Sequence, residues 1–194
     1  TTVFLKLRDI GQKVLPPYEE QFLEVPMAEV QGEAYRRMQS ILVQELKHAL
    51  VLHDNSLLGV VMNVLLAWPD CAFRFESVQH PRTRKVLYSQ PAVFSEGESS
   101  PKELELLRIC KEEKANGRRV LAYSIYSGTR DTTARLKSQL EQEGLKVAVL
   151  RASVDAARRE DWVADQVERG IDVMICNPEL VKTGLDLLEF PTIV

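Results

Sequence analysis

Three segments of the sequence place polar side chains directly after a short apolar run. Ser124, Tyr126, Ser127 and Gly128 follow "VLAY", Arg151 follows "VAVL", and Asn177, Lys182 and Thr183 follow "VMIC". Hydroxyl, amide and cationic groups bind phosphate oxygens, and exposed backbone N–H groups add to them. This set therefore suggests the binding of a phosphate chain. Because loops at strand ends are polar in many α/β domains, an ordinary surface loop stays open as the alternative.

The sequence offers no nucleotide-hydrolysing centre of its own. "KTG" at Lys182 to Gly184 is not a P-loop, because the glycines that shape that loop are missing upstream. The histidines are too far apart for a metal box, and we interpret them as structural or surface residues. We therefore predict no catalytic residue, no metal site and no bound cofactor in this chain. By itself the chain would have no site for the β and γ phosphates of ATP with Mg²⁺.

The polar segments belong to an alternating pattern of strands and helices. We predict strands at Arg118 to Tyr126, Lys146 to Ala152 and Asp172 to Cys176, with helices at Thr132 to Gly144 and around Trp162. Strands that are apolar throughout and separated by helices are typical of a parallel sheet covered on both faces. The predicted fold class is therefore α/β, and ligands of such sheets bind at the carboxyl ends of the strands. The polar segments would meet at that edge.

The first half of the chain has a different pattern. Residues 19–27 alternate enough to predict a strand, and the apolar positions of Ala28 to Leu52 follow a helical period. The nearly all-apolar Leu57 to Trp68 predicts a second helix, so the two form an antiparallel hairpin. Ser100, Pro101 and Glu103 carry the start signal of a further helix. We therefore divide the chain into a link with a strand at 1–27, a helical protrusion at 28–88, a linker at 89–101 and an α/β unit at 102–194.

Composition narrows the possible partners. The chain has 194 residues, 45% of them hydrophobic, and a net charge of -3, so it can bury a core but has no overall attraction to nucleic acid or anionic lipid. Its three cysteines lie far apart, which favours free thiols in a reducing compartment. The longest apolar run, Leu57 to Trp68, is too short to span a bilayer. We predict a soluble protein without a membrane partner. A surface that binds nucleic acid would be limited to a small part of the protein.

The order of these segments resembles that of a known class of motor. Three segments are similar in order and spacing to motifs IV to V of superfamily two helicases and translocases. They are "VLAYSIYSGTRD", "LRAS" followed by "RRE", and "VMICNPELVKTGLDL". The upstream half, with "LKLRDIGQKVLPPYEEQFLEVPM", "LLAWPD", "SSPKELELL" and "NGRRVLAYS", resembles the Swi/Snf-type DNA-dependent ATPases. In that family a link from the first motor lobe leads to a helical protrusion and then to the second RecA-like lobe.

The resemblance implies a role for each candidate residue. The DNA backbone would be contacted by the motif IV residues Ser124, Tyr126, Ser127 and Gly128 and by Arg151, Asn177, Lys182 and Thr183. The nucleotide cleft would be lined by Gly184 and Asp186. The intact motor would bind ATP and Mg²⁺ against its own first RecA-like lobe and move along duplex DNA without sequence preference, in the cytoplasm or nucleoid, or in a eukaryotic nucleus. The resemblance places motif VI after Val194. We therefore expect a fragment that does not hydrolyse ATP alone.

Two other classes remain open at this stage. One is a non-catalytic α/β binding or signalling module, such as a receiver-like domain. A receiver needs a clustered acidic pocket with an aspartate at a strand end, and no predicted strand here ends in that way. The other is a helicase lobe of the same superfamily that acts on single-stranded nucleic acid. The long helices predicted for the protrusion argue against this class only because of the resemblance to the Swi/Snf-type ATPases.

Overall fold

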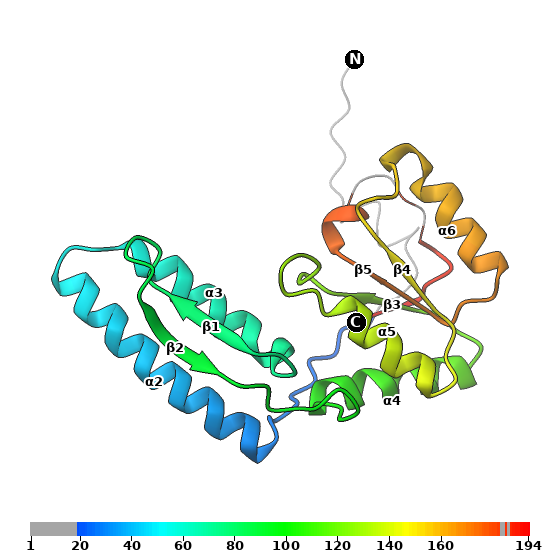
Figure 1. Cartoon of the computed structure of the whole chain (residues 1–194). Coiled ribbons are helices and arrows are strands. Elements are labelled where there is room, and N and C mark those ends of the chain that lie inside the picture. Colours follow the sequence, from blue (N-terminus) through cyan, green and yellow to red (C-terminus); the bar gives the residue numbers. More distant parts are fainter. Residues whose placement is uncertain (1–18, 183–184, 186) are drawn as a thin grey trace.

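The protein has two parts, an α/β unit and an elongated protrusion (Figure 1). The computed structural model describes residues 19–182, 185 and 187–194. Three predicted site residues, Thr183, Gly184 and Asp186, lie outside the described residues. Within the described part of the chain, no helix is long and apolar enough to cross a membrane.

The α/β unit is built on a parallel sheet of four strands in the order β4-β5-β3-β6. The strands are β3 (Val120–Tyr123), β4 (Val147–Leu150), β5 (Val173–Cys176) and β6 (Thr192–Ile193). Helices α4 (Pro101–Ala115) and α5 (Thr133–Gln142) cover one face, and α6 (Arg159–Glu168) covers the other. Two short 3₁₀ helices, η1 (Ala156–Arg158) and η2 (Pro178–Leu180), follow β4 and β5. The predicted α/β fold with helices on both faces is confirmed.

Alternation along the central strand β5 explains why both faces are covered. Val173 and Ile175 pack with α4 and α5, whereas Met174 and Cys176 pack on the side of α6. All four side chains are fully buried, as expected for a strand between two helical layers. Burial also raises the pKa of Cys176 to about 12, which favours the protonated thiol near neutral pH.

The start of α4 follows its sequence signal. The Ser100 Oγ accepts a hydrogen bond from the Glu103 amide at 3.3 Å, and the Glu103 carboxylate accepts one from the Ser100 amide at 2.6 Å. This capping box satisfies two backbone donors that the first turn leaves without helical partners. The predicted helix start is therefore confirmed.

The protrusion contains the predicted antiparallel pair of helices, α2 (Glu29–Val51) and α3 (Ser56–Cys71). Met38 and Leu42 of α2 are fully buried against Val64 and Trp68 of α3. Trp68 thus belongs to the core and is not an exposed stacking platform for bases. The helical hairpin has its own hydrophobic cluster, separate from the two clusters of the sheet.

In the first half, one element was not predicted and one prediction is wrong. Besides the predicted helical hairpin, the protrusion contains an antiparallel pair of strands, β1 (Glu76–Gln79) and β2 (Val86–Gln90), and β2 extends into the predicted linker. The sequence signal was weak because both strands are short and their connection lacks an Asn-Gly or Asp-Gly turn. Residues 19–28 form neither helix nor strand. Among the strands that the structure describes, none pairs with this segment, and the Phe22 side chain is 87% exposed. The alternating pattern of the segment therefore has no buried face to match.

A partly buried ion pair connects α4 to the edge of the sheet. The Glu113 carboxylate accepts hydrogen bonds from Arg118 Nε and Nη2, both at 2.6 Å, and from the Thr192 hydroxyl at 2.5 Å. The Arg118 guanidinium, with a smaller contribution from Thr192, lowers the pKa of Glu113 from its ordinary 4.5 to about 2. Glu113 therefore stabilises the edge strand β6 in its ionised form.

The lowered pKa predicts how acid affects stability. A carboxyl group whose folded-state pKa is depressed contributes stability above its unfolded-state pKa and loses it as the pH falls toward the folded value. We expect Glu113→Gln to be less stable than the wild type near neutral pH, and the difference to shrink between about pH 4.5 and pH 2. Urea unfolding across this range measures it. A difference independent of pH would show that the charge of Glu113 does not act in this way.

Candidate phosphate-binding edge

A pocket of about 430 Å³ lies at the carboxyl ends of β3, β4 and β5. It is lined by Ser127, Thr133, Val149, Leu150, Arg151, Ala152, Ser153, Asn177, Glu179 and Leu180. Parallel strands bring the loops that follow them to one edge of the sheet, so segments far apart in the sequence meet there (Figure 1). Three of the predicted residues, Ser127, Arg151 and Asn177, therefore share one pocket.

Asn177 joins the loop after β5 to the loop after β3. Its Nδ2 donates to the Ile125 carbonyl at 3.3 Å and to the Ser127 Oγ at 3.1 Å, while its Oδ1 accepts from the Glu179 amide at 2.9 Å and caps η2. Because Ser127 Oγ accepts from Asn177, its own O–H is left to donate. Ser127 is exposed, so that donor is available to a ligand.

Arg151 approaches the same pocket from β4. Its Nη1 lies 3.2 Å from Asp131 Oδ2, and its side chain is 50% exposed. Burial opposes ionisation of Asp131, but hydrogen bonds from Thr133 and the ion pair with Arg151 keep its pKa below the ordinary value. Within the described part of the chain, the other guanidinium nitrogens of Arg151 have no hydrogen-bond acceptor. They are therefore available to a phosphate oxygen.

Most of the charges described around the pocket are paired. Lys182 is exposed and pairs with Glu179, just as Arg151 pairs with Asp131. Arg159 adds a further cation, which donates to the Val154 and Leu180 carbonyls at 3.3 and 2.9 Å. A phosphate would therefore be held mainly by directed hydrogen bonds.

Ser124 has a structural position. Only 8% of its surface is exposed, its Oγ lies 2.7 Å from the Thr132 Oγ1, and its amide donates to the Cys176 carbonyl at 2.9 Å. These contacts hold the loop against β5. Because the hydroxyl is buried and paired, we leave Ser124 out of the proposed ligand contacts.

Tyr126 and Gly128 lie differently from Ser127. Tyr126 lines a separate pocket together with Leu23 of the link and Lys102 of α4, and burial raises the pKa of its phenol. Gly128 is exposed, and a Cβ at this position would meet nothing within 4 Å, so the backbone around it is open. Of the four predicted motif IV residues, the structure thus brings only Ser127 into the pocket.

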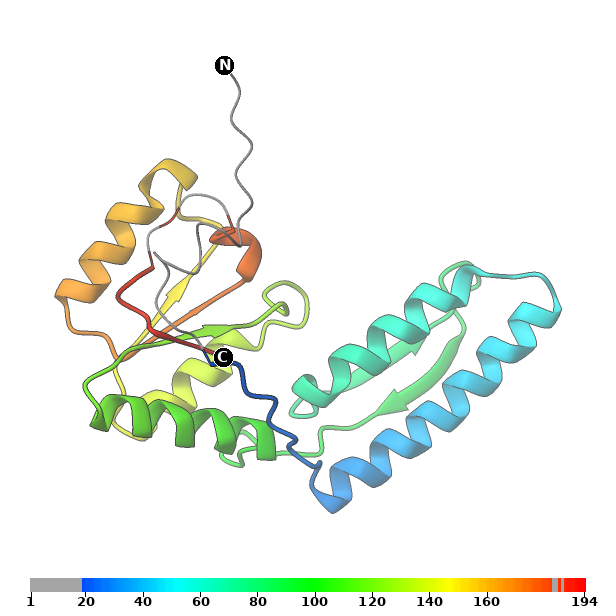
Figure 2. The same cartoon turned by 180° about the vertical axis from the view of Figure 1, so that it is seen from behind.

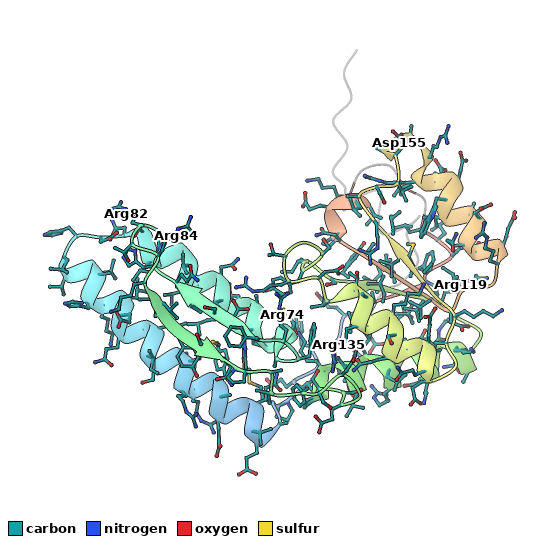
Figure 3. The ribbon with its side chains drawn as sticks, in the orientation of Figure 1. Arg74, Arg82, Arg84, Arg119, Arg135 and Asp155 are labelled. Carbon is teal, nitrogen blue, oxygen red and sulfur yellow. The ribbon has the colours of Figure 1, made fainter. Side chains whose placement is uncertain are left out.

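Sequence reasoning missed the residues that hold the loop between β3 and α5, at 124–132. Arg130 Nε and Nη2 lie 3.0 and 2.8 Å from the two carboxylate oxygens of Glu76, and Nη1 donates to Asn63 Oδ1 at 2.6 Å. Arg74 donates to the Thr129 carbonyl at 2.6 Å (Figure 3). The loop is therefore anchored to the protrusion as well as to the sheet. Only the fold reveals this, because the partners lie more than 50 residues apart in sequence.

No protein-family model matches the sequence, and no curated protein matches it either. Among the described residues, no three His, Cys, Asp or Glu side chains are grouped so that they could hold a metal ion.

Proposed function

We propose that the chain is the second RecA-like lobe, with its protrusion, of an ATP-driven translocase on duplex DNA. The observation that carries the proposal is the meeting of Ser127, Arg151 and Asn177 in one pocket at the carboxyl edge of a parallel sheet. The resemblance of the sequence to motifs IV and V supports the same assignment. The edge would hold the phosphates of one DNA strand.

Each residue has a defined part in this proposal. The Ser127 hydroxyl and the unpaired guanidinium nitrogens of Arg151 would donate to phosphate oxygens, and Asn177 would position Ser127. The open backbone at Gly128 would let a DNA strand approach closely. Backbone contacts of this kind carry no base information, so the binding would be independent of sequence.

In the complete motor, ATP and Mg²⁺ would bind between this lobe and the first one. Gly184 and Asp186 would lie near the nucleotide, as the resemblance implies. Opening and closing of that cleft would move the DNA grip of one lobe relative to the other. The alternative of a receiver-like module has less support, because the two carboxylates at the edge, Asp131 and Glu179, are each paired with a cation.

The proposal predicts weak, salt-sensitive binding of DNA by the chain. Fluorescence anisotropy with a short labelled duplex should give an affinity that does not depend on sequence and falls steeply with salt. In Ser127→Ala combined with Arg151→Ala, affinity should fall about 10-fold or more, because a hydrogen bond to a charged group is worth about 1.5 kcal/mol or more. The slope of log affinity against log salt should decrease by about one, for one lost cation.

Two controls separate loss of the site from loss of charge or fold. Ser40→Ala with Arg169→Ala removes the same groups away from the site: Ser40 is exposed on α2, and Arg169 is an exposed residue paired with Asp165 as Arg151 is with Asp131. Leu140→Ala is the folding control, since Leu140 is 2% exposed in the core. A site variant that binds as tightly as the Ser40/Arg169 control would contradict the proposed phosphate contacts.

A further inference from the structure

We infer that the turn between β1 and β2, residues His80–Lys85, is a second contact for the phosphates of the same nucleic acid; this inference rests on the proposed function. The turn contains Arg82, Arg84 and Lys85 and no acidic residue, although the whole chain has a net charge of -3. Cations are thus concentrated on six residues of a chain that is acidic elsewhere. Local clusters of this kind are what attract a polyanion to a protein without overall positive charge.

The backbone of the turn is held in one shape by His80. The Nδ1 of His80 accepts hydrogen bonds from the Arg82 and Thr83 amides at 3.2 and 3.4 Å. The His80 carbonyl accepts from the Arg84 amide at 2.9 Å, and the His80 amide donates to the Lys85 carbonyl at 2.8 Å. The cationic side chains therefore extend from an ordered base, which lowers the entropy cost of placing them on a ligand.

Arg84 adopts a backbone conformation that favours glycine or asparagine. Its φ is 61°, in the left-handed region that residues with a Cβ rarely adopt. Strained positions of this kind often occur at functional sites, and the side chain retained at this one is a cation.

The cations of the turn are weakly neutralised. Asp54 reaches the turn from the loop between α2 and α3, and its oxygens lie 3.5 Å from His80 Nε2 and 3.7 Å from Arg82 Nη1. The Arg82 side chain is nevertheless 72% exposed. Among the residues that the structure describes, neither Arg84 nor Lys85 forms an ion pair with a carboxylate, and both are exposed. Their charge is therefore available to a partner.

The turn is structurally connected to the candidate site. Strand β1 begins at Glu76, which binds Arg130 of the loop 124–132, and it leads directly into the turn at His80. Arg82 and Arg84 lie at the outer end of the protrusion, away from the α/β unit (Figure 3). In both views of the molecule, the loop 124–132 lies between the protrusion and η2 (Figure 1 and Figure 2). A nucleic acid long enough to reach from the sheet edge along the protrusion would meet both contacts.

Paired neutral substitutions test this inference. Arg82→Gln with Lys85→Gln removes two charges and leaves the strained Arg84 in place. Arg36→Gln with Arg37→Gln removes two charges from exposed positions of α2 and is the matched control. In anisotropy titrations with a duplex long enough to cover both parts, the turn variant should lower the slope of log affinity against log salt by about two. The α2 control should leave the slope unchanged.

The outcomes separate this inference from the proposed function. In the first case, the turn variant and the α2 control have the same salt-dependence slope as the wild type, while Ser127→Ala/Arg151→Ala loses affinity. The sheet edge then contacts the phosphates and the turn does not. In the second case, the turn variant has a smaller slope while the Ser127/Arg151 variant binds normally, which supports the contact at the turn and contradicts the proposed site. Equal losses in the turn variant and the α2 control would also overturn the inference, since they would show only a general charge effect.

Discussion

Replacing Arg135 with alanine should lower the free energy of unfolding by about 3–5 kcal/mol. Arg135 lies on α5 where the linker, α4 and the protrusion meet (Figure 3), and its side chain is only 9% exposed. Its Nε is 2.6 Å from Glu103 Oε1, it donates to the carbonyls of Ser95 and Glu98, and its guanidinium lies 4.6 Å from the centre of the Phe73 ring. Truncation would leave the 11% exposed Glu103 carboxylate without its cation and those carbonyls without a donor.

Chemical unfolding of Arg135→Ala measures this cost, with Arg108→Ala as the control. Arg108 pairs with Glu105 and Glu112 along α4, but its side chain is 55% exposed. Exposed pairs contribute about 0–1 kcal/mol, so the control should unfold almost as the wild type does. Similar losses in both variants would show that burial of the Arg135 pair is not the cause.

Replacing Arg130 with methionine should destabilise the protein by about 3 kcal/mol and also weaken DNA binding. Arg130 holds both oxygens of Glu76, whose side chain is 9% exposed, and this pairing raises the pKa of the Arg130 guanidinium. Methionine fills much of the space but leaves the buried carboxylate of Glu76 unpaired. Since Arg130 also anchors the loop that carries Ser127, the loop should lose its fixed position and bind phosphate less well.

The double variant Glu76→Gln/Arg130→Met provides the decisive comparison for the stability effect. Removing the carboxylate as well as its partner eliminates the uncompensated charge, so the double variant should be more stable than Arg130→Met alone. DNA affinity should stay reduced in both, because neither restores the anchor. If Glu76→Gln adds its own destabilisation in full, the two side chains are not coupled as the structure indicates.

The sequence predicted the α/β unit well because its signals are local. The apolar runs at β3, β4 and β5 and the capping box at Ser100 and Glu103 depend on neighbouring residues only. The parallel arrangement then follows from the intervening helices. The meeting of Ser127, Arg151 and Asn177 could also be predicted, since the loops after parallel strands share an edge.

What the sequence could not predict depends on long-range contacts. The strands β1 and β2 are stabilised by each other and by α2, and neither is long enough to be recognised alone. The burial of Ser124 depends on Thr132, and the anchoring of Arg130 depends on Glu76 in the other part of the protein. Leu136 illustrates the same limit: its helical spacing suggests a core position, but it is only half-buried, and Leu140 is the core residue of α5.

Nuclear magnetic resonance mapping of DNA on the protein tests the central claim most directly. A titration of the isotope-labelled chain with an unlabelled short duplex reports which backbone amides change environment. The proposed phosphate site predicts salt-sensitive shifts that include Ser127, Gly128, Arg151, Ser153 and Asn177, and the second contact predicts further shifts at His80–Lys85 with a longer duplex. Shifts confined to other surfaces, such as the exposed faces of α4 and α6, with none at the pocket residues, would contradict the assignment of the sheet edge to DNA.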